Sequence, residues 1–418
     1  MKILHTADWH LGHRLGRIDR SADLRRAVGR VVKFCLDERV DVLLVCGDVF
    51  HEVGRTEVLR ESIQHLCEVF GPFFAAGGTV LAITGNHDKE HQASILQQAM
   101  RLAAPADTQP GDTLAPGRFY LFTGPTFFRL PDHAARGTHV QFVMMPWPTA
   151  TRYLDEPAQK FPSTEERNRA LRAAFNRRLN HILTHPAFDK GLHTVLAAHV
   201  ITRGAEIRPG LGLNESDAVV LDDAELPTAF AYVALGDVHK PQCLMGLSHV
   251  RYAGSIERLD LNEGEDQKGV VVVEVGPGGR QGEPQWVPLE STPVYRVRID
   301  DPPSQVPVLA ERFPDHDRAL VNLHVTYQPG RDNLNSVLAE LERVFPYWYD
   351  RHWEATGGAD SGGAAAGATA RSAAADPARI RDTVCNYLAD RLAGRDDVEE
   401  LLALAESLLA EEAEGAAS

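Results

Sequence analysis

The stretch from Asp41 to His51 constrains the fold of this chain more than any other. Residues 42–46 form an apolar run that is rich in β-branched side chains and too short for a helix. A run that is apolar at every position is typical of a strand buried on both faces of a parallel sheet. Gly47 then allows a sharp turn, and Asp48 follows at the carboxyl end of the strand. Open α/β sheets bind ligands at that edge, so Asp48 is a candidate metal or phosphate ligand, with a helix-capping Asp as the alternative.

The same pattern of a buried strand followed by a polar side chain recurs along the chain. Strands are predicted over residues 2–7, 79–84, 194–198 and 231–235. Their ends hold Asp8 and His10, Asn86 and His87, His199, and Asp237 and His239. Asp8 and His10 are two residues apart, which places both on one side of an extended backbone, whereas His5 has the opposite parity and is expected to be a packing residue. A turn Asp and a surface His would explain the pair taken alone, but three successive βα units with such ends make that interpretation improbable.

Two helices are predicted between the first three strands, so we expect an α/β fold with β-sheets flanked by helices. Ser21 is expected to cap a helix that runs to about residue 38, and a second helix is expected from about Thr56. None of the five cysteines forms a C-x-x-C pair, and Cys35 and Cys67 are predicted to be small core residues in a reducing compartment. No signal peptide or membrane-spanning apolar stretch is visible, so we expect a soluble, cytoplasmic protein without membrane contact.

The middle of the chain continues the alternation of strands and helices. Strands are predicted over 119–130, 138–145 and 269–275. Ser163-Thr-Glu-Glu166 is a capping box that opens a helix with an apolar stripe through Leu171, Phe175 and Leu179. The arginines of this helix are expected to form a solvated face, and contact with a DNA backbone is the alternative.

The pattern changes near residue 290. Strands over 294–299 and 320–327 and helices near 307–313 and 333–344 suggest a small α+β unit, and a linker rich in Ala, Gly and Ser follows. Two short helices are expected after Pro377, and their apolar stripes should dock on a partner, with folding back onto this chain as the alternative. The predicted parts are 1–289, 290–355, 356–377 and 378–418.

The charge of the chain is uneven. The formal net charge is −15, and residues 380–418 carry ten acidic and three basic side chains, a net −7. A sequence-independent DNA coat protein would normally be basic, so this class is disfavoured.

The strand-end residues form a set of oxygen and nitrogen ligands larger than one metal ion needs. The set is Asp8, His10, Asp48, Asn86, His199, Asp237 and His239. Such a set suits two divalent metals, as in phosphatases and nucleases, with Asp48 on a central strand as the bridge. Ligands without thiolates favour Mn²⁺ over iron or zinc, with Mg²⁺ as an alternative. His87 would face the phosphate, stabilising the transition state or protonating the leaving oxygen, and His51 could orient or charge-balance His87.

These motifs, taken in order, resemble those of the calcineurin-like metallophosphoesterases over about residues 1–260. The resemblance rests on Asp8-x-His10, Gly47-Asp48, Gly85-Asn86-His87-Asp88, His199 and Gly236-x-x-His239. More narrowly, residues 1–12, Gly47–His51 and Tyr252-x-Gly-Ser-Ile-Glu-Arg258 resemble the SbcD family, the nuclease subunits of bacterial SbcCD complexes.

The resemblance implies a Mn²⁺-dependent exonuclease and endonuclease that processes DNA ends and hairpins in repair and recombination, usually as a homodimer. It implies that 290–355 is a capping domain and that 378–418 docks on an SbcC-type coiled-coil ATPase. ATP would act only through that partner, because the chain has no G-x-x-x-x-G-K-[S/T] motif. The alternatives are a phosphodiesterase acting on small nucleotides, which should lack the two C-terminal parts, and a non-catalytic scaffold that docks an ATPase.

One departure from the family pattern concerns the metal ligands. The family usually has Gly-His-x-His where this chain has Gly236-Asp237-Val238-His239. Asp is a competent ligand, so Asp237 stays in the predicted site. It adds a negative charge and shortens the reach of the side chain, which should change the geometry and affinity of the second metal.

Overall fold

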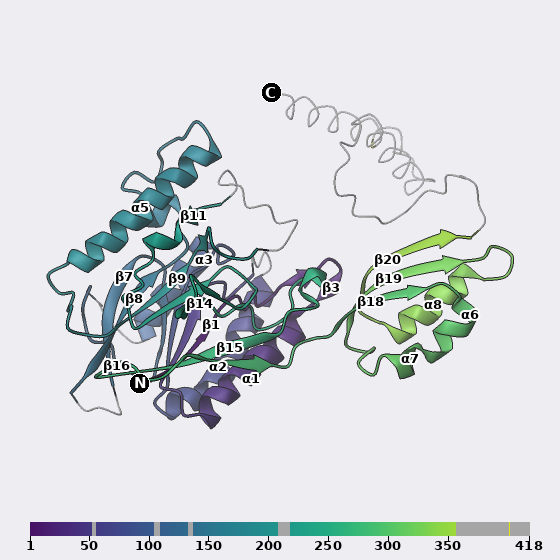
Figure 1. Ribbon diagram of the computed structural model, residues 1–418, viewed down its shortest axis with the longest axis horizontal. Coiled ribbons are helices and arrows are strands. Elements are labelled where there is room, and N and C mark those ends of the chain that lie inside the picture. Colours follow the sequence, from purple (N-terminus) through teal and green to yellow (C-terminus); the bar gives the residue numbers. More distant parts are fainter. Residues whose placement is uncertain (52–55, 104–108, 133–136, 208–217, 357–400, 402–418) are drawn as a thin grey trace. The chain divides into compact units, whose positions relative to one another are not determined.

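The computed structural model describes residues 1–51, 56–103, 109–132, 137–207, 218–356 and 401. Two β-sheets pack face to face, and helices cover the outer face of each (Figure 1). The predicted linker 356–377 and the docking segment 378–418 lie outside the described residues, apart from Thr356 and Leu401. No helix among the described residues is long and apolar enough to cross a membrane.

The first sheet contains the buried strand that precedes Asp48. In spatial order its strands are β16 (Gly279–Arg280), β15 (Lys268–Gly276), β1 (Lys2–Thr6), β4 (Val42–Cys46), β5 (Thr79–Ile83) and β6 (Phe119–Phe122), with β17 (Gln285–Leu289) paired to β15. Strands β1, β4, β5 and β6 are parallel, and β15 is antiparallel to β1. All five residues of β4 are buried, because Leu43 and Val45 face the helices while Val42, Leu44 and Cys46 face the second sheet. The predicted burial of this strand on both faces is therefore confirmed.

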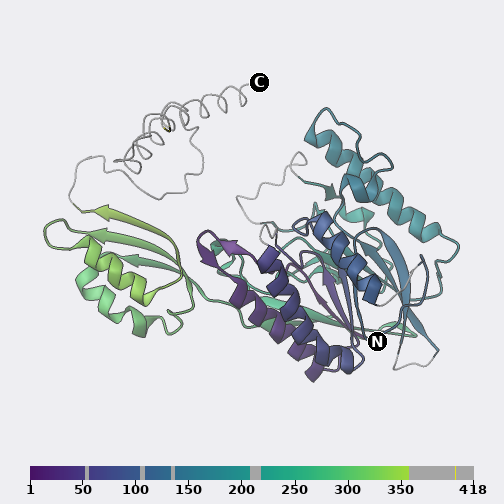
Figure 2. The ribbon, with the colours of Figure 1, turned by 180° about the vertical axis from the view of Figure 1, so that it is seen from behind.

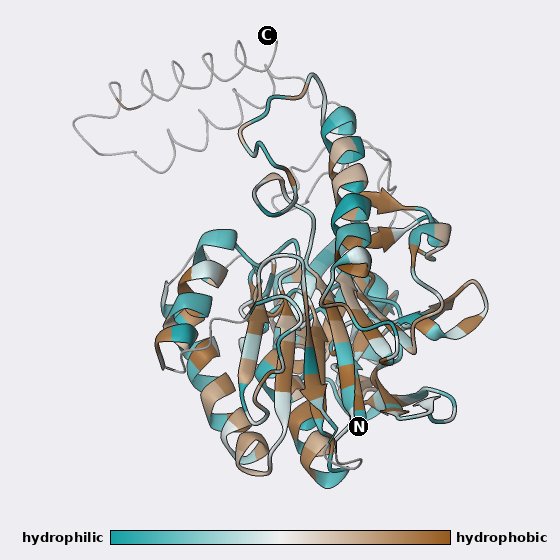
Figure 3. Cartoon of the chain, turned by 90° about the vertical axis from the view of Figure 1, so that its left-hand side faces the viewer, coloured by the Kyte–Doolittle hydropathy of each residue, from teal (hydrophilic) through white to brown (hydrophobic). Residues whose placement is uncertain are grey.

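The second sheet closes the other side of the inner core. In spatial order its strands are β13 (Gln242–Leu244), β14 (Leu247–Tyr252), β12 (Tyr232–Gly236), β9 (Thr194–His199), β8 (His139–Met145) and β7 (Thr126–Pro131). Apolar side chains of β8, β9 and β12 meet those of β1, β4 and β5 in one buried cluster. Figure 3 shows the strands near the centre of the view as largely brown, in keeping with an apolar interface between the two sheets.

Helices cover the outer faces of both sheets. Helices α1 (Ser21–Asp37), α2 (Thr56–Ala75) and α3 (Glu90–Ala103) pack on the first sheet, as Figure 2 shows from behind. Helices α4 (Ala150–Tyr153) and α5 (Thr164–Thr184) pack on the second. Ser163 caps α5 as predicted, since its side chain accepts a hydrogen bond from the Glu166 backbone N–H. Three arginines of α5 pair with nearby carboxylates, namely Arg169, Arg172 and Arg178.

Two details of the first helices differ from the prediction. Ser21 is the first residue of α1 and not its cap, and its backbone N–H donates to Asp19 Oδ1 at 2.8 Å. Cys35 is buried as predicted, but Cys67 is exposed. The buried side of α2 runs through Ser62, Leu66, Phe70 and Phe73, and Cys67 follows Leu66 by one residue, about 100° further around the helix.

The described part of the first 290 residues also contains several short elements. They are β2 (Arg14–Leu15), β3 (Ile18–Asp19), β10 (Ile201–Thr202), β11 (Val220–Leu221) and the one-turn helices η1 (Asp223–Glu225) and η2 (Leu261–Glu263). Hairpin β2–β3 contributes Leu15 and Ile18 to a small apolar cluster with Leu320.

Residues 294–355 form a separate three-stranded parallel sheet with its own hydrophobic cluster. Its elements are β18 (Val294–Ile299), α6 (Pro302–Gln305), η3 (Val306–Val308), α7 (Leu309–Arg312), β19 (Leu320–Tyr327), α8 (Leu334–Val344) and β20 (Trp348–Ala355). The sequence patterns missed β20, because it is only half-buried and its aromatic and charged residues do not alternate with a period of two. This sheet and the sandwich belong to one compact unit, residues 1–356, so the boundary near residue 290 remains a prediction.

Candidate metal centre

The carboxyl ends of five strands from both sheets carry the predicted ligands. Asp8 and His10 follow β1, Asp48 follows β4, Asn86 follows β5, His199 ends β9, and Asp237 and His239 follow β12. His5, inside β1, is buried, with ring nitrogens near the Tyr232 hydroxyl at 2.9 Å and the Leu235 carbonyl at 3.2 Å. Its predicted packing role is confirmed.

The backbone at the ligands has an unusual conformation. Six non-glycine residues among those described have positive φ, and four of them are Asp8, His10, Asp48 and Asp237, with φ of 53°, 47°, 52° and 92°. Such residues are uncommon and cluster at functional sites, where the surrounding structure holds them. The predicted extended backbone at Asp8 and His10 is therefore wrong. Both side chains reach the site because the chain turns through left-handed conformations after β1.

One group of ligands gathers Asp8, His10 and His239, whose ligand atoms all lie within 4.8 Å of one another. The Nδ1 atom of His239 lies 2.9 Å from Glu263 Oε1. A carboxylate can only accept, so Nδ1 carries the proton and Nε2 keeps its lone pair for a metal.

A second group surrounds His199. Its Nδ1 donates to the Cys46 carbonyl at 2.7 Å, which leaves the lone pair on Nε2. This atom lies 3.1 Å from Asn86 Oδ1 and 3.6 Å from both Asp48 Oδ2 and Asp237 Oδ1. Four potential ligand atoms thus converge on one point. The residues fit a divalent cation at this point.

Asp48 lies between the two groups. Its Oδ2 is 3.3 Å from His10 Nε2 in the first group and 3.6 Å from His199 Nε2 in the second. Its Oδ1 accepts a hydrogen bond from the backbone N–H of His87, at 2.9 Å. This position is the one that a ligand shared by two ions requires.

The ionisation of the ligands also fits bound cations. Burial raises the pKa of Asp48 well above its usual range, and the neighbouring Asp88 and Asp8 raise it further. Burial raises the pKa of Asp8 to about 6, although His239 acts against this shift. Burial lowers the pKa of His199 to about 3, so its imidazole is neutral at physiological pH. The neutral imidazole of His199 beside crowded carboxylates is an arrangement that a divalent cation stabilises.

Asp237, the residue that departs from the family pattern, lies in the second group. Burial and the neighbouring Asp8 raise the pKa of Asp237 to about 8. Its backbone N–H donates to Asp8 Oδ1 at 3.1 Å. Its Oδ2 is buried and has no hydrogen-bond partner in the part of the chain that the structure describes. A buried carboxylate oxygen of this kind is available to a metal.

His87 and His51 lie beside the first group. Their rings stack, with centroids 4.8 Å apart and planes 20° apart. His51 Nδ1 is also 3.1 Å from His10 Nδ1, a contact with a metal ligand that sequence reasoning did not anticipate. His10, His51 and His87 have ring nitrogens within 4.8 Å of one another, so geometry alone also allows His87 as a ligand.

Close approach of two loops explains two glycines at the site. A Cβ on Gly85 would lie 2.0 Å from Asp48 Oδ1, and a Cβ on Gly47 would lie 2.0 Å from His199 Nδ1. Gly47 also has a φ of 92°. Both motif glycines are required because the ligand side chains occupy the space that a side chain would need.

Sequence reasoning missed three residues that support the ligands. The Asp88 carboxylate accepts hydrogen bonds from the backbone N–H groups of Val49, Phe50 and Gly85, and so ties two ligand loops together. Glu263 and Lys268 contact His239. Asp88 belongs to the motif Gly85-Asn86-His87-Asp88, which could have indicated its role. The sequence around Glu263 and Lys268 contains no pattern that indicates a role for either residue.

Comparison with known proteins agrees with this geometry. Residues 1–195 match the family described as calcineurin-like phosphoesterase. The chain is 29% identical over 308 residues to the SbcD subunit of the nuclease SbcCD from Rhodobacter capsulatus, covering 72% of this chain and 71% of that one. It is 26% identical over 289 residues to the Bacillus subtilis protein of the same name, covering 66% and 67%.

A third relative is the DNA double-strand break repair protein Mre11 of Aeropyrum pernix, 25% identical over 311 residues, which cover 72% of this chain and 63% of the relative. The family match spans the strand ends at Asp8, Asp48 and Asn86, and the similarity to the relatives extends further along the chain. The buried groups of Asp and His ligands lie where those strands end. Residues 1–195 therefore belong to the calcineurin-like phosphoesterase family, and the chain is a metallophosphoesterase with SbcD nuclease subunits among its relatives.

Proposed function

We propose that this chain is a Mn²⁺-dependent DNA nuclease subunit that processes DNA ends and hairpins together with an SbcC-type ATPase. The observation that carries the proposal is the position of Asp48 Oδ2, 3.3 Å from His10 Nε2 and 3.6 Å from His199 Nε2. Two ligand groups that share a carboxylate suit two-metal cleavage of a phosphodiester. The relatives named as nuclease subunits support DNA as the substrate.

The chain's own residues would hold two ions. Asp8, His10 and His239 would bind one, Asn86, His199 and Asp237 would bind the other, and Asp48 would bind both. The bound ions would polarise the phosphoryl oxygens and lower the pKa of water. The mixture of carboxylate, amide and imidazole ligands favours Mn²⁺, with Mg²⁺ as the alternative. The hydrogen bonds from His199 to Cys46 and from His239 to Glu263 orient both imidazoles before any ion binds.

His87 would act on the phosphate. Its backbone N–H donates to Asp48, which anchors the loop, and its ring centroid lies 4.8 Å from that of His10. An imidazole here can donate a hydrogen bond to a phosphoryl oxygen in the transition state or protonate the leaving oxygen. His51 would hold both rings in place, because it stacks on His87 and contacts His10 Nδ1.

The C-terminal parts would adapt this core to its partner. We propose that residues 290–355 act as a capping domain, that 356–377 are a flexible linker, and that 378–418 dock on the ATPase. ATP would enter only through that partner. Resemblance to SbcD also supports a homodimer.

Digestion assays test the proposed substrate. The full chain is incubated with Mn²⁺ and linear, hairpin or circular single-stranded DNA, alongside a small phosphodiester. Degradation of linear duplex ends together with cleavage of hairpin and circular substrates is expected. Turnover of the small phosphodiester alone would favour the nucleotide phosphodiesterase, and no turnover in a chain that still binds the ATPase would favour the scaffold.

A further inference from the structure

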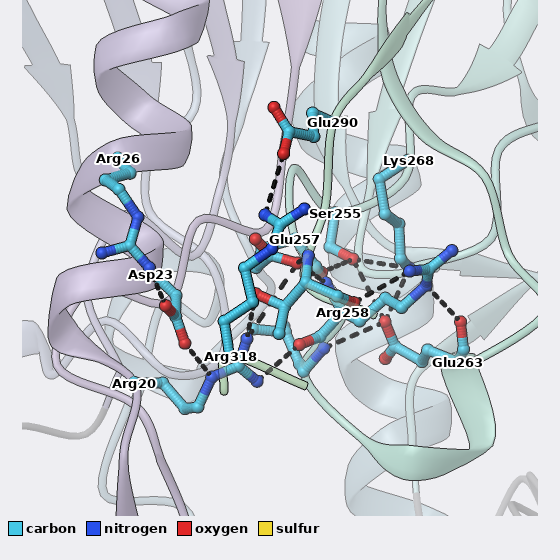
Figure 4. Close-up of polar contacts among 12 residues, drawn as sticks. Arg20, Asp23, Arg26, Ser255, Glu257, Arg258, Glu263, Lys268, Glu290 and Arg318 are labelled. Carbon is cyan, nitrogen blue, oxygen red and sulfur yellow. Dashed lines mark hydrogen bonds and ion pairs between the residues drawn. The ribbon is translucent and has the colours of Figure 1, made fainter. Parts of the chain in front are cut away.

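A cluster of buried charges lies next to the metal centre, in the loop between β14 and β15 and at Lys268, the first residue of β15 (Figure 4). Glu263 Oε2 lies 2.6 Å from Lys268 Nζ, and both side chains are almost fully buried, with exposed fractions of 6% and 0%. Isolated buried charges destabilise a fold strongly, so a pair of this kind survives only where good geometry and further hydrogen bonds offset the loss of water.

Both members of this ion pair contact His239. Glu263 Oε1 accepts from the ring Nδ1 at 2.9 Å. Lys268 Nζ donates to the His239 backbone carbonyl at 3.0 Å and to Ser255 Oγ at 2.9 Å. The ring and the backbone of this one ligand are therefore held by the two ends of a single ion pair.

The loop is itself anchored at its far side. Glu257 Oε1 accepts from the Thr292 backbone N–H at 2.7 Å, and the Arg258 guanidinium donates to the Thr292 carbonyl at 2.8 Å. Arg20, which is fully buried, donates to the Arg258 carbonyl at 2.7 Å. Figure 4 shows these side chains converging on the loop. Ser255, Glu257 and Arg258 belong to the motif run 252–258, and this anchoring gives that run a structural role.

We propose that Glu263 and Lys268 are positioning residues that hold His239 with Nε2 toward Asp8 and His10, so that the first metal site is formed before the ion arrives. The inference rests on the proposed two-metal function. Carboxylates that orient a ligating histidine typically change metal affinity by about 10- to 100-fold when they are removed.

Removal of Glu263 should weaken the binding of mainly one of the two ions, the one held by His239. In the second group, His199 is oriented from a different element, because its Nδ1 donates to the carbonyl of Cys46 at the end of β4. Removal of Glu263 leaves that hydrogen bond in place, so the ion beside His199 should keep its ligand geometry.

The test measures Mn²⁺ binding to the full-length chain by calorimetry and by electron paramagnetic resonance, which distinguishes a coupled pair of ions from a single ion. Variant E263A should bind the first-site ion about 10- to 100-fold more weakly and keep the other ion at wild-type affinity. Its spectrum should change from that of a coupled pair to that of a single Mn²⁺. Variant E265A carries the same change at an exposed position of the same loop and should match the wild type in both measurements.

A charge-neutral double variant separates positioning from folding. K268M removes the cation that is paired with the buried Glu263 carboxylate and should weaken binding of the same ion. E263Q/K268M removes both charges and keeps an oxygen acceptor for His239. The double variant should recover part of the affinity lost in K268M. Thermal unfolding in EDTA shows whether each variant is folded.

Two results would overturn the inference. One is retention of both ions at wild-type affinity in E263A. The other is simultaneous loss of both ions in every variant, including E263Q/K268M, which would assign the ion pair to general stability. If the wild-type chain itself binds fewer than two Mn²⁺ ions, the two-metal proposal fails first, and this outcome is distinguishable because it needs no variant.

Discussion

Asp48 shows how one side chain can control the whole site. Its two carboxylate oxygens face the His87 backbone on one side and the imidazoles of His10 and His199 on the other. Replacement by Ala should remove the ligand common to both ions and abolish hydrolysis. Metal content and nuclease rate are measured together, with D41N at the opposite end of β4 as the control. Two bound ions and near-normal activity in D48A would contradict the assignment.

His87 should behave differently, because its proposed contribution arises in the transition state. We expect H87A to keep both ions and DNA affinity while kcat falls by about 10²- to 10⁴-fold. Equilibrium DNA binding, metal content and single-turnover rates distinguish these quantities. Loss of an ion in H87A would instead make His87 a ligand, in keeping with its closeness to His10 and His51.

The raised pKa of Asp237 predicts that the stability of the metal-free protein depends on pH. Burial raises its pKa to about 8 from an ordinary value of 3.8. The folded state therefore binds more protons than the unfolded state between these pH values, and the stability from this group is lost as pH rises toward 8. Variant D237N should lack this loss. In EDTA, the unfolding free energy of D237N relative to the wild type should increase from pH 6.5 to pH 8.

Urea unfolding at several pH values checks this expectation. Above pH 6.5 the histidines with lowered pKa, such as His199, are neutral in the folded state and mostly neutral when unfolded. A pH-independent difference between wild type and D237N would show that the Asp237 carboxylate keeps its ordinary pKa.

At the scale of elements, the site depends on how closely two βα loops approach. The loop after β4 carries Asp48 and the loop after β5 contains Gly85, where an added Cβ would lie 2.0 Å from Asp48 Oδ1. G85A should displace Asp48, weaken metal binding and destabilise the fold, typically by about 1–3 kcal/mol for an overpacked site.

Gly124 offers a matched control for G85A. An added Cβ at Gly124 meets nothing within 4 Å, so G124A should leave metal binding unchanged. The Mn²⁺ affinities of both variants are measured by calorimetric titration and compared. Equal affinity in G85A and G124A would show that the loops can separate without loss of the site.

At the scale of the whole molecule, the catalytic unit should be separable from the docking segment. A compact unit ends at Thr356, and β20 runs from Trp348 to Ala355. A truncation after Trp353 would cut this strand, so the shortened chain should end after Thr356. The truncated protein should keep Mn²⁺-dependent cleavage of single-stranded DNA but lose co-purification with the ATPase and ATP-stimulated cleavage of duplex ends.

A pull-down and a nuclease assay compare the full-length and truncated chains. The acidic residues of 380–418, net −7, predict a basic surface on the partner, so binding of the full-length chain should weaken with salt. Undiminished binding of the truncated chain would rule out docking through 378–418.

The strands and the types of ligand that follow them could be predicted from the amino-acid sequence. Both are local properties: β4 is apolar at every position and is followed at once by Gly47 and Asp48. Parallel strands bring their carboxyl ends to one edge, so consecutive βα units were enough to predict that Asp8, Asp48 and Asn86 lie together. The apolar stripe of α5 through Leu171, Phe175 and Leu179 is buried as predicted. The predicted burial of Cys67 is wrong, because the rotation of α2 on its sheet depends on packing.

The way in which the ligands are held became clear only from the tertiary structure. The left-handed backbone at Asp8, His10, Asp48 and Asp237 is imposed by surrounding contacts and has no signature in residue spacing. Glu263 and Lys268 reach His239 from 24 and 29 residues away. Such partners come together because the two sheets pack on one core. A periodic pattern within a single strand or helix does not predict which distant residues that packing brings together.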